Sequence, residues 1–221
     1  MPAPQTIIIA GDSADWPLEP LRDVVLLCER AGVEAVVLQD RIAPAQGGQA
    51  WPDALILIGW LAAKTERIKL LAEVSSLGHQ PYNLARRLAS LSLISRGRTG
   101  WVIADDEEAA DAYAAFSGRN RFDGVDLPGR AKEFETVVTG LWRSWDAEAL
   151  VLDREGGQFF RPEAMRSLDH EGEHFSVKGP LNVMRAPSGA PIVWRKDDFS
   201  GATSVATPDE AFALLDGEPR R

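Results

Sequence analysis

Apolar and polar positions alternate along the chain in blocks that predict strands and helices in turn. Short runs rich in β-branched residues, typical of buried strands, occur at residues 6–10, 33–38, 68–74 and 100–104. Between them, apolar residues recur every three or four positions and predict helices over 21–31, 52–64 and 79–97. One strand–helix unit follows the next at roughly 30-residue intervals. The pattern therefore predicts an α/β fold of parallel strands joined by right-handed crossovers.

The helix predicted within residues 79–97 connects two of these strands. Pro81 occupies its first turn, where proline is tolerated, and Gly97 is the expected stop. We expect one apolar face, made of residues spaced by three and four: Leu84, Leu88, Leu91 and Ile94. The preceding residues, beginning at His79, then lie just past the end of a strand, where α/β folds place their ligands.

The second half of the chain begins with helices predicted over residues 106–116 and 128–145. Residues 146–190 lack periodicity and carry scattered Gly, Pro and aromatic residues, so we expect an irregular excursion with one or two hairpins. Further strands are predicted at 191–194 and 203–206, and a last helix at 208–215. Since 221 residues can bury one substantial core, we predict a single domain over residues 1–221.

Composition indicates which partners are unexpected and which cellular compartment is favoured. The formal net charge is −9, whereas nucleic acids and anionic membranes attract basic surfaces, so neither is an expected partner. A single cysteine, Cys28, falls on the apolar face of a predicted helix and is expected to be buried and inert. We find no apolar run of about 20 residues and no basic leader, which favours a cytoplasmic location.

Several segments together resemble a known family. They include CERAGVEAVVLQD, HQPYNLARRLASLSLISRGRTGW, EFETVVTGLWRSW and, most specifically, HEGEHFSVKGPLN with RAPSGAPIV. The chain resembles the bacterial-luciferase-like flavin monooxygenases, in the branch of the nitrilotriacetate and dibenzothiophene-sulfone monooxygenases. The resemblance implies a TIM-barrel-like (β/α) fold, reduced FMN as cofactor, a separate flavin reductase as partner and a small-molecule substrate. A closed barrel needs about 250 residues, so we expect an incomplete one.

The resemblance also implies candidate residues for the flavin site. Asp40, at a strand's carboxyl end, could contact the ring or substrate, or else cap the following loop. His79 and Asn83 match the family's histidine-x-proline-x-asparagine pattern and could approach the flavin; alternatively they fix the loop by local hydrogen bonds. No catalytic residue can be assigned from the sequence.

A phosphate-binding segment is the second candidate. Ser200 and Gly201 could offer a hydroxyl and an amide to the flavin phosphate, with Arg195 and Lys196 adding positive charge. The alternative is an exposed loop. His170 and His174 lack a third ligand of suitable spacing, so we predict no metal site.

The chain departs from the family at several of these positions. The family's Trp-Asn-x-Val-Thr strand is replaced by Trp101 to Ala104, without its polar groups, and its His…Arg-Tyr signal is reduced to Arg130 and Ala131. Trp194 replaces a polar cofactor contact and could fill the flavin space itself. Two functions therefore stay open: an FMN-dependent monooxygenase, and a shortened non-catalytic relative that binds flavin or another ligand or serves as a structural dimer.

An incomplete barrel leaves strand edges and apolar helix faces to be covered. The helix beginning at Pro52 is apolar on nearly all sides, which predicts deep burial or a subunit contact. We therefore expect a homodimer, with residues 54–63 as its contact.

Overall fold

The computed structural model describes residues 5–10, 16–40, 52–104, 107–119, 121–195, 198 and 201–216. Its centre is a six-stranded parallel sheet in the order β10-β1-β2-β3-β4-β9. The strands are β1 (Thr6–Ile9), β2 (Ala35–Gln39), β3 (Lys69–Val74), β4 (Thr99–Ile103), β9 (Ile192–Trp194) and β10 (Thr203–Val205). The run from β1 through β4 to β9 follows the strand order of a (β/α) barrel. The prediction of an incomplete TIM-barrel-like fold is confirmed.

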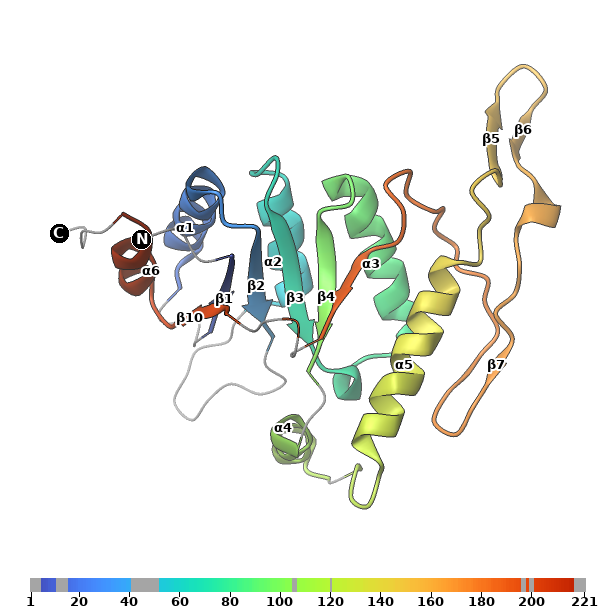
Figure 1. Ribbon diagram of the computed structural model, residues 1–221. Helices are drawn as coiled ribbons and strands as arrows, with labels where there is room; N and C mark the ends of the chain where they lie inside the picture. The colour runs from blue at the N-terminus through green and yellow to red at the C-terminus, as the bar shows by residue number, and fades with distance from the viewer. Residues whose placement is uncertain are drawn as a thin grey trace.

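The helices are α1 (Leu18–Ala31), α2 (Ala54–Ala62), α3 (Pro81–Ser95), α4 (Glu107–Ser117), α5 (Leu127–Trp142) and α6 (Pro208–Asp216). The first three cover one face of the sheet, α5 packs against α3 and α6 against α1, and α4 lies beyond the carboxyl ends of the strands (Figure 1). Strands and helices agree with the predicted elements to within a few residues. No described helix combines the length and the apolar composition that crossing a membrane requires.

Alternation along the strands separates two apolar faces. One set of side chains packs against the helices in the main core. It consists of the even-numbered residues of β2 and β3 and the odd-numbered residues of β4, for example Val36, Leu70 and Trp101. The opposite face, which we call the inner face, holds a second cluster of fully buried side chains. These are Ala35, Val37, Leu71 and Val102, with Ile8, Ile192 and Trp194 packed against them. The inner face is the surface that lines the interior when a barrel closes.

The buried face of α3 differs from the predicted one at its end. Leu84 and Leu88 are fully buried and Leu91 is partly buried, as expected, but Ile94 is 65% exposed. Because the helix turns by 3.6 residues, the contact with the sheet continues instead through small side chains, and Ser92 and Ser95 are fully buried. The prediction that Ile94 belongs to the core face was wrong.

The segment 146–190 contains two hairpins, in agreement with the sequence. β5 (Leu150–Asp153) pairs with β6 (Gln158–Phe160), and β7 (His170–Glu171) pairs with β8 (Ser176–Val177). Both hairpins lie beside α5 at one side of the sheet (Figure 1). At the opposite edge, β10 pairs in parallel with β1, so the end of the described chain returns to its beginning.

Cys28 lies on the buried face of α1, as the sequence predicted. Burial raises the pKa of its thiol to about 12, with a smaller opposing effect from a backbone hydrogen bond. Since the thiolate is the reactive form, this cysteine is inert at neutral pH.

Candidate functional site

Three partly buried side chains converge beyond the carboxyl ends of β2 and β3. Asp40 directly follows β2, Asp53 precedes α2, and His79 lies between β3 and α3. One ligand atom from each of the three lies within 4.8 Å of the other two. Because the carboxyl ends of parallel strands share one edge of the sheet, residues distant in sequence meet there. The structure thus brings together two residues that the sequence predicted, Asp40 and His79, and adds a third.

His79 is held by the turn that follows β3. That turn is a short 3₁₀ helix, η1 (Ser76–Gly78), and the N–H of His79 donates to the Ser76 carbonyl at 3.2 Å. The imidazole Nδ1 lies 3.0 Å from the Ser75 carbonyl oxygen. A carbonyl can only accept, so this contact favours the tautomer protonated at Nδ1, with the lone pair on Nε2. The local hydrogen bond expected as the alternative role of His79 is therefore present.

Asp53 was not predicted as a site residue. It is the N-cap of α2, where one carboxylate oxygen accepts from the N–H of Ile56 at 3.1 Å. The other oxygen lies 3.6 Å from a guanidinium nitrogen of Arg87 on α3. In the sequence, Asp53 stands directly before an apolar helix, which indicates a helix N-cap. That position does not indicate which residues from other strand–helix units lie near it.

A hydrogen-bonded pair on the inner face was also missed. Gln39 and Glu73 are register partners at the ends of β2 and β3, and Gln39 Nε2 donates to Glu73 Oε2 at 3.0 Å. Glu73 is 9% exposed, which is rare for a carboxylate in a strand. Strand alternation placed residue 73 on the same face as residue 71, but the register with β2 could not be read from the sequence.

Arg130 of α5 reaches back to this edge of the sheet. Its guanidinium carbon lies 5.2 Å from the Phe122 ring centroid and 4.8 Å from that of Phe175. Its Nη1 donates to the Ser76 hydroxyl at 2.5 Å. Arg130 therefore fixes η1, the turn that positions His79, and remains part of the site's framework although its neighbouring family residues are absent.

The other predicted residues that the structure describes are not members of this cluster. Asn83 is exposed on the first turn of α3. Arg195 donates to both carboxylate oxygens of Glu135 on α5, each at 2.9 Å. That pairing raises the pKa of the Arg195 guanidinium above its ordinary value. Gly201 is exposed, with φ of +107°. Lys196 and Ser200 lie outside the described residues.

The apolar substitutions in β4 alter one wall of the inner face. Trp101 points into the helix-facing core, where its Nε1 donates to the Val74 carbonyl at 3.1 Å. Val102, at the position of the family's asparagine, is fully buried on the inner face. Trp194 of β9 packs on the same face, with the Lys69 ammonium 5.7 Å from its ring centroid. This wall is therefore apolar, whereas the neighbouring wall carries Gln39 and Glu73.

The two histidines of the HEGEH segment have a structural role. Glu133 of α5 accepts from the backbone N–H groups of His174 and Phe175, at 3.0 and 2.9 Å, and lies 3.0 Å from His170 Nε2. Burial raises the pKa of the Glu133 carboxyl, but these hydrogen bonds outweigh it and hold the pKa below its ordinary value. Glu133 thus anchors the β7–β8 hairpin to α5.

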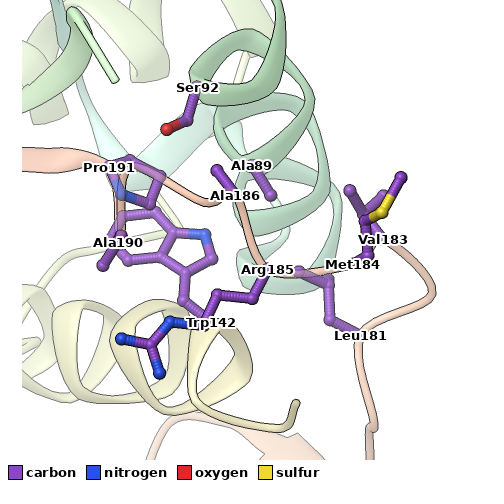
Figure 2. Close-up of a pocket in the computed structure, with 11 residues that line it drawn as sticks. Ala89, Ser92, Trp142, Leu181, Val183, Met184, Arg185, Ala186, Ala190 and Pro191 are labelled. Carbon is purple, nitrogen blue, oxygen red and sulfur yellow. The ribbon is translucent and has the colours of Figure 1, made fainter. Parts of the chain in front are cut away.

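A shallow cleft lies at the other end of α3. Its walls come from the last turns of α3 and α5 and from residues 181–191, and it is partly open to solvent (Figure 2). Ser92 Oγ is buried there and has no hydrogen-bond partner within the described part of the chain. The rest of the lining is mostly apolar, as for Trp142, whose Nε1 donates to the Ala85 carbonyl at 3.0 Å. One water molecule would satisfy the serine. The cleft is separate from the Asp40–Asp53–His79 cluster.

The fold and the cluster at its carboxyl edge define a barrel-type α/β protein, and comparison with known proteins specifies the family. The sequence profile of the family "Luciferase-like monooxygenase" matches residues 6–214. Nitrilotriacetate monooxygenase component A of Aminobacter aminovorans is 33% identical over 187 residues, which cover 77% of this chain and 41% of that protein. Dibenzothiophene-sulfone monooxygenase of Rhodococcus erythropolis is 39% identical over 149 residues, covering 67% and 32%.

Solved structures agree. A riboflavin lyase, crystallised with modified FMN and riboflavin, matches with a TM-score of 0.70 and 26% identity, over 87% of this chain and 50% of that one. The chain belongs to the luciferase-like monooxygenase family, as its resemblance predicted. It spans about half or less of the length of the curated relatives reported above.

Proposed function

We propose that this chain binds FMN at the carboxyl edge of its sheet and takes part in the oxygenation of a small organic molecule. The observation that carries the proposal is the convergence of Asp40 and His79 from different strand–helix units at the edge where barrel proteins bind ligands. Family membership supplies the reaction class. Reduced flavin supplies the electrons that activate dioxygen, and a separate flavin reductase would deliver it.

The residues at this edge fit the ring portion of a flavin. The flavin ring has an apolar body and a polar pyrimidine edge. Trp194, packed against the buried cluster that contains Val102, offers an apolar wall, and Gln39 and His79 offer polar groups. The protein's part would be to orient the ring, exclude water and hold a substrate against it. For the phosphate, the backbone of Gly201 is exposed, but Arg195 is already engaged by Glu135. The phosphate contacts proposed from sequence would require Arg195 to leave that pair.

The oxygenation proposal is tested by following reoxidation of photoreduced FMN by dioxygen in a stopped-flow instrument. We expect saturating protein to change the time course relative to free reduced FMN, because a bound ring is shielded from solvent. Bovine serum albumin at the same concentration is the control. An unchanged time course in a protein that does bind FMN would overturn the oxygenase role.

An unchanged time course together with FMN binding would favour a non-catalytic family member that binds flavin. One observation favours this alternative: the inner-face position of the family's asparagine is occupied by Val102, which is fully buried and apolar. A hydrogen bond to the flavin from this strand position is therefore lost. Val102→Asn restores the family's asparagine at this position. If catalysis depends on that side chain, the variant should change the reoxidation time course of reduced FMN more than the unaltered chain does.

We also propose a homodimer. Most apolar residues of α2 are buried against the sheet and α3, but Ile56 on its outer side is 65% exposed. A second copy packed on this side would cover it. Light scattering at micromolar concentration is expected to give twice the chain mass for the unaltered protein and a lower mass for Ile56→Asp; a monomeric unaltered chain would contradict the proposal.

A further inference from the structure

The Asp40–Asp53–His79 cluster has the composition of a metal site. It offers two carboxylates and one imidazole, and one ligand atom of each lies within 4.8 Å of the others. Ligands on opposite sides of one ion bound at 2.0–2.2 Å lie about 4.0–4.4 Å apart, so a small movement of the side chains would bring the three atoms to a single ion. As whole residues all three are partly buried, although the Asp53 side chain is 37% exposed.

The imidazole is oriented as metal-binding histidines usually are. Its Nδ1 contacts the Ser75 carbonyl at 3.0 Å, a bond outside the cluster. A backbone carbonyl on one ring nitrogen fixes the tautomer and the ring plane and leaves the other nitrogen to bind the metal. Arg130, through Ser76, fixes the turn that carries both the carbonyl and the ring. The histidine is therefore pre-organised by contacts that the cluster itself does not supply.

The charges of the cluster also favour a cation. Two carboxylates at this separation repel each other, and a divalent ion between them removes the repulsion. A guanidinium nitrogen of Arg87 lies 3.6 Å from Asp53, but both side chains of this pair are substantially exposed, at 52% and 37%. An exposed pair of this kind contributes little, so Arg87 competes only weakly with a divalent ion.

We propose that Asp40, Asp53 and His79 bind one divalent transition-metal ion, such as Mn²⁺ or Zn²⁺. A nitrogen ligand beside two carboxylates suits these ions better than Ca²⁺ or Mg²⁺, which prefer oxygen alone. Three protein ligands leave positions for water or for an oxygen of a bound small molecule. This site shares Asp40 and His79 with the flavin proposal and differs from it in using Asp53.

Mn²⁺ binding to the full, chelator-treated chain can be measured by the loss of the free-ion electron paramagnetic resonance signal, with Zn²⁺ as competitor. We expect one Mn²⁺ per chain, displaced by Zn²⁺. Asp53→Asn and His79→Gln should each weaken binding by at least about 100-fold, because loss of a hydrogen-bond partner behind a ligand already costs roughly 10–100-fold. Asparagine also caps helices, so the first variant keeps the start of α2 intact. Asp146→Asn, which removes a carboxylate from the ion pair with Arg166, is the matched control and should bind normally.

Arg87→Gln provides a change in the opposite direction. Because it removes the competing charge, Mn²⁺ affinity is expected to rise several-fold by the Coulomb interaction at this separation. No binding of either ion at millimolar concentration, or equal affinity in the unaltered chain and Asp53→Asn, would overturn the proposal. FMN titration of the same metal-free samples is read separately, so a failed metal site and a failed flavin site give different results.

Discussion

Replacing Trp101 by alanine is expected to lower the free energy of unfolding by about 3–5 kcal/mol, the usual range for deleting a large buried aromatic side chain. Trp101 is fully buried on β4, between β3 and β9, and its ring packs edge-on against Phe134 with centroids 5.7 Å apart. The indole N–H also donates to the Val74 carbonyl across to β3. Urea denaturation monitored by far-ultraviolet circular dichroism measures the loss.

Two further variants separate the contributions at this position. Trp101→Phe keeps a ring against Phe134 but loses the hydrogen bond and some volume, so we expect an intermediate loss of about 1–3 kcal/mol. Ile94→Ala, on the exposed side of α3, should change stability by no more than about 0.5 kcal/mol. If Ile94→Ala cost as much as Trp101→Ala, the assignment of these two side chains to surface and core would be wrong.

Removal of the Glu29 carboxylate is expected to cost about 2–4 kcal/mol, because charged groups make the stronger protein hydrogen bonds. A single oxygen, Glu29 Oε1, accepts from the backbone N–H groups of Glu66, Arg67 and Ile68 at 2.9, 2.6 and 3.0 Å. These residues form the turn between α2 and β3, so one side chain of α1 holds the entry to a central strand. Glu29→Ala and Glu29→Gln, compared by urea denaturation at pH 7, measure this contribution.

The same contact predicts a dependence on pH. Burial raises the pKa of the Glu29 carboxyl, but the hydrogen bonds from Arg67, Ile68 and Glu66 and the charge of Arg67 outweigh it, so the folded-state pKa is lowered. The stabilisation is therefore complete above the unfolded-state pKa, about 4.3, and is lost as the pH falls through the lower folded-state value. The free energy of unfolding of Glu29→Gln should depend less steeply on pH in this acidic range than that of the unaltered chain.

Glu34→Gln is the control for Glu29. Glu34 pairs with Lys69 at 2.6 Å, but both side chains are substantially exposed, so its loss should cost no more than about 1 kcal/mol. Equal losses for the Glu34 and Glu29 variants at pH 7 would show that the backbone contacts of Glu29 contribute nothing special.

The central elements of the fold were predictable because their periodicities are strong. β2 and β3 are buried on both faces, so they read as continuous apolar runs, and α1 ends at Gly32, whose φ of +80° suits glycine. The position of β10 was not predictable. Its three residues identify a strand, but its pairing with β1, nearly 200 positions earlier, depends on how the chain closes in space.

The candidate site was predictable in part, for a similar reason. Asp40 and His79 stand at strand ends, so the sequence pattern and the family resemblance both point to them. Asp53 precedes a helix and reads only as a cap, and the Gln39–Glu73 pair depends on the register of two strands. For Arg195 the sequence suggested a contact that the structure does not favour. Its charge indicated a phosphate contact, but its side chain pairs with Glu135, which lies 60 residues away on α5.

Titration of FMN fluorescence with the purified, metal-free chain tests most directly whether the carboxyl edge of the sheet binds flavin. We predict saturable quenching at one FMN per chain, and at least about tenfold weaker binding for His79→Ala, as expected for loss of a buried polar contact with the ligand. Ser92→Ala, in the cleft at the other end of α3, should bind as the unaltered chain does. No quenching at the highest protein concentration, or unchanged affinity in His79→Ala, would contradict this account.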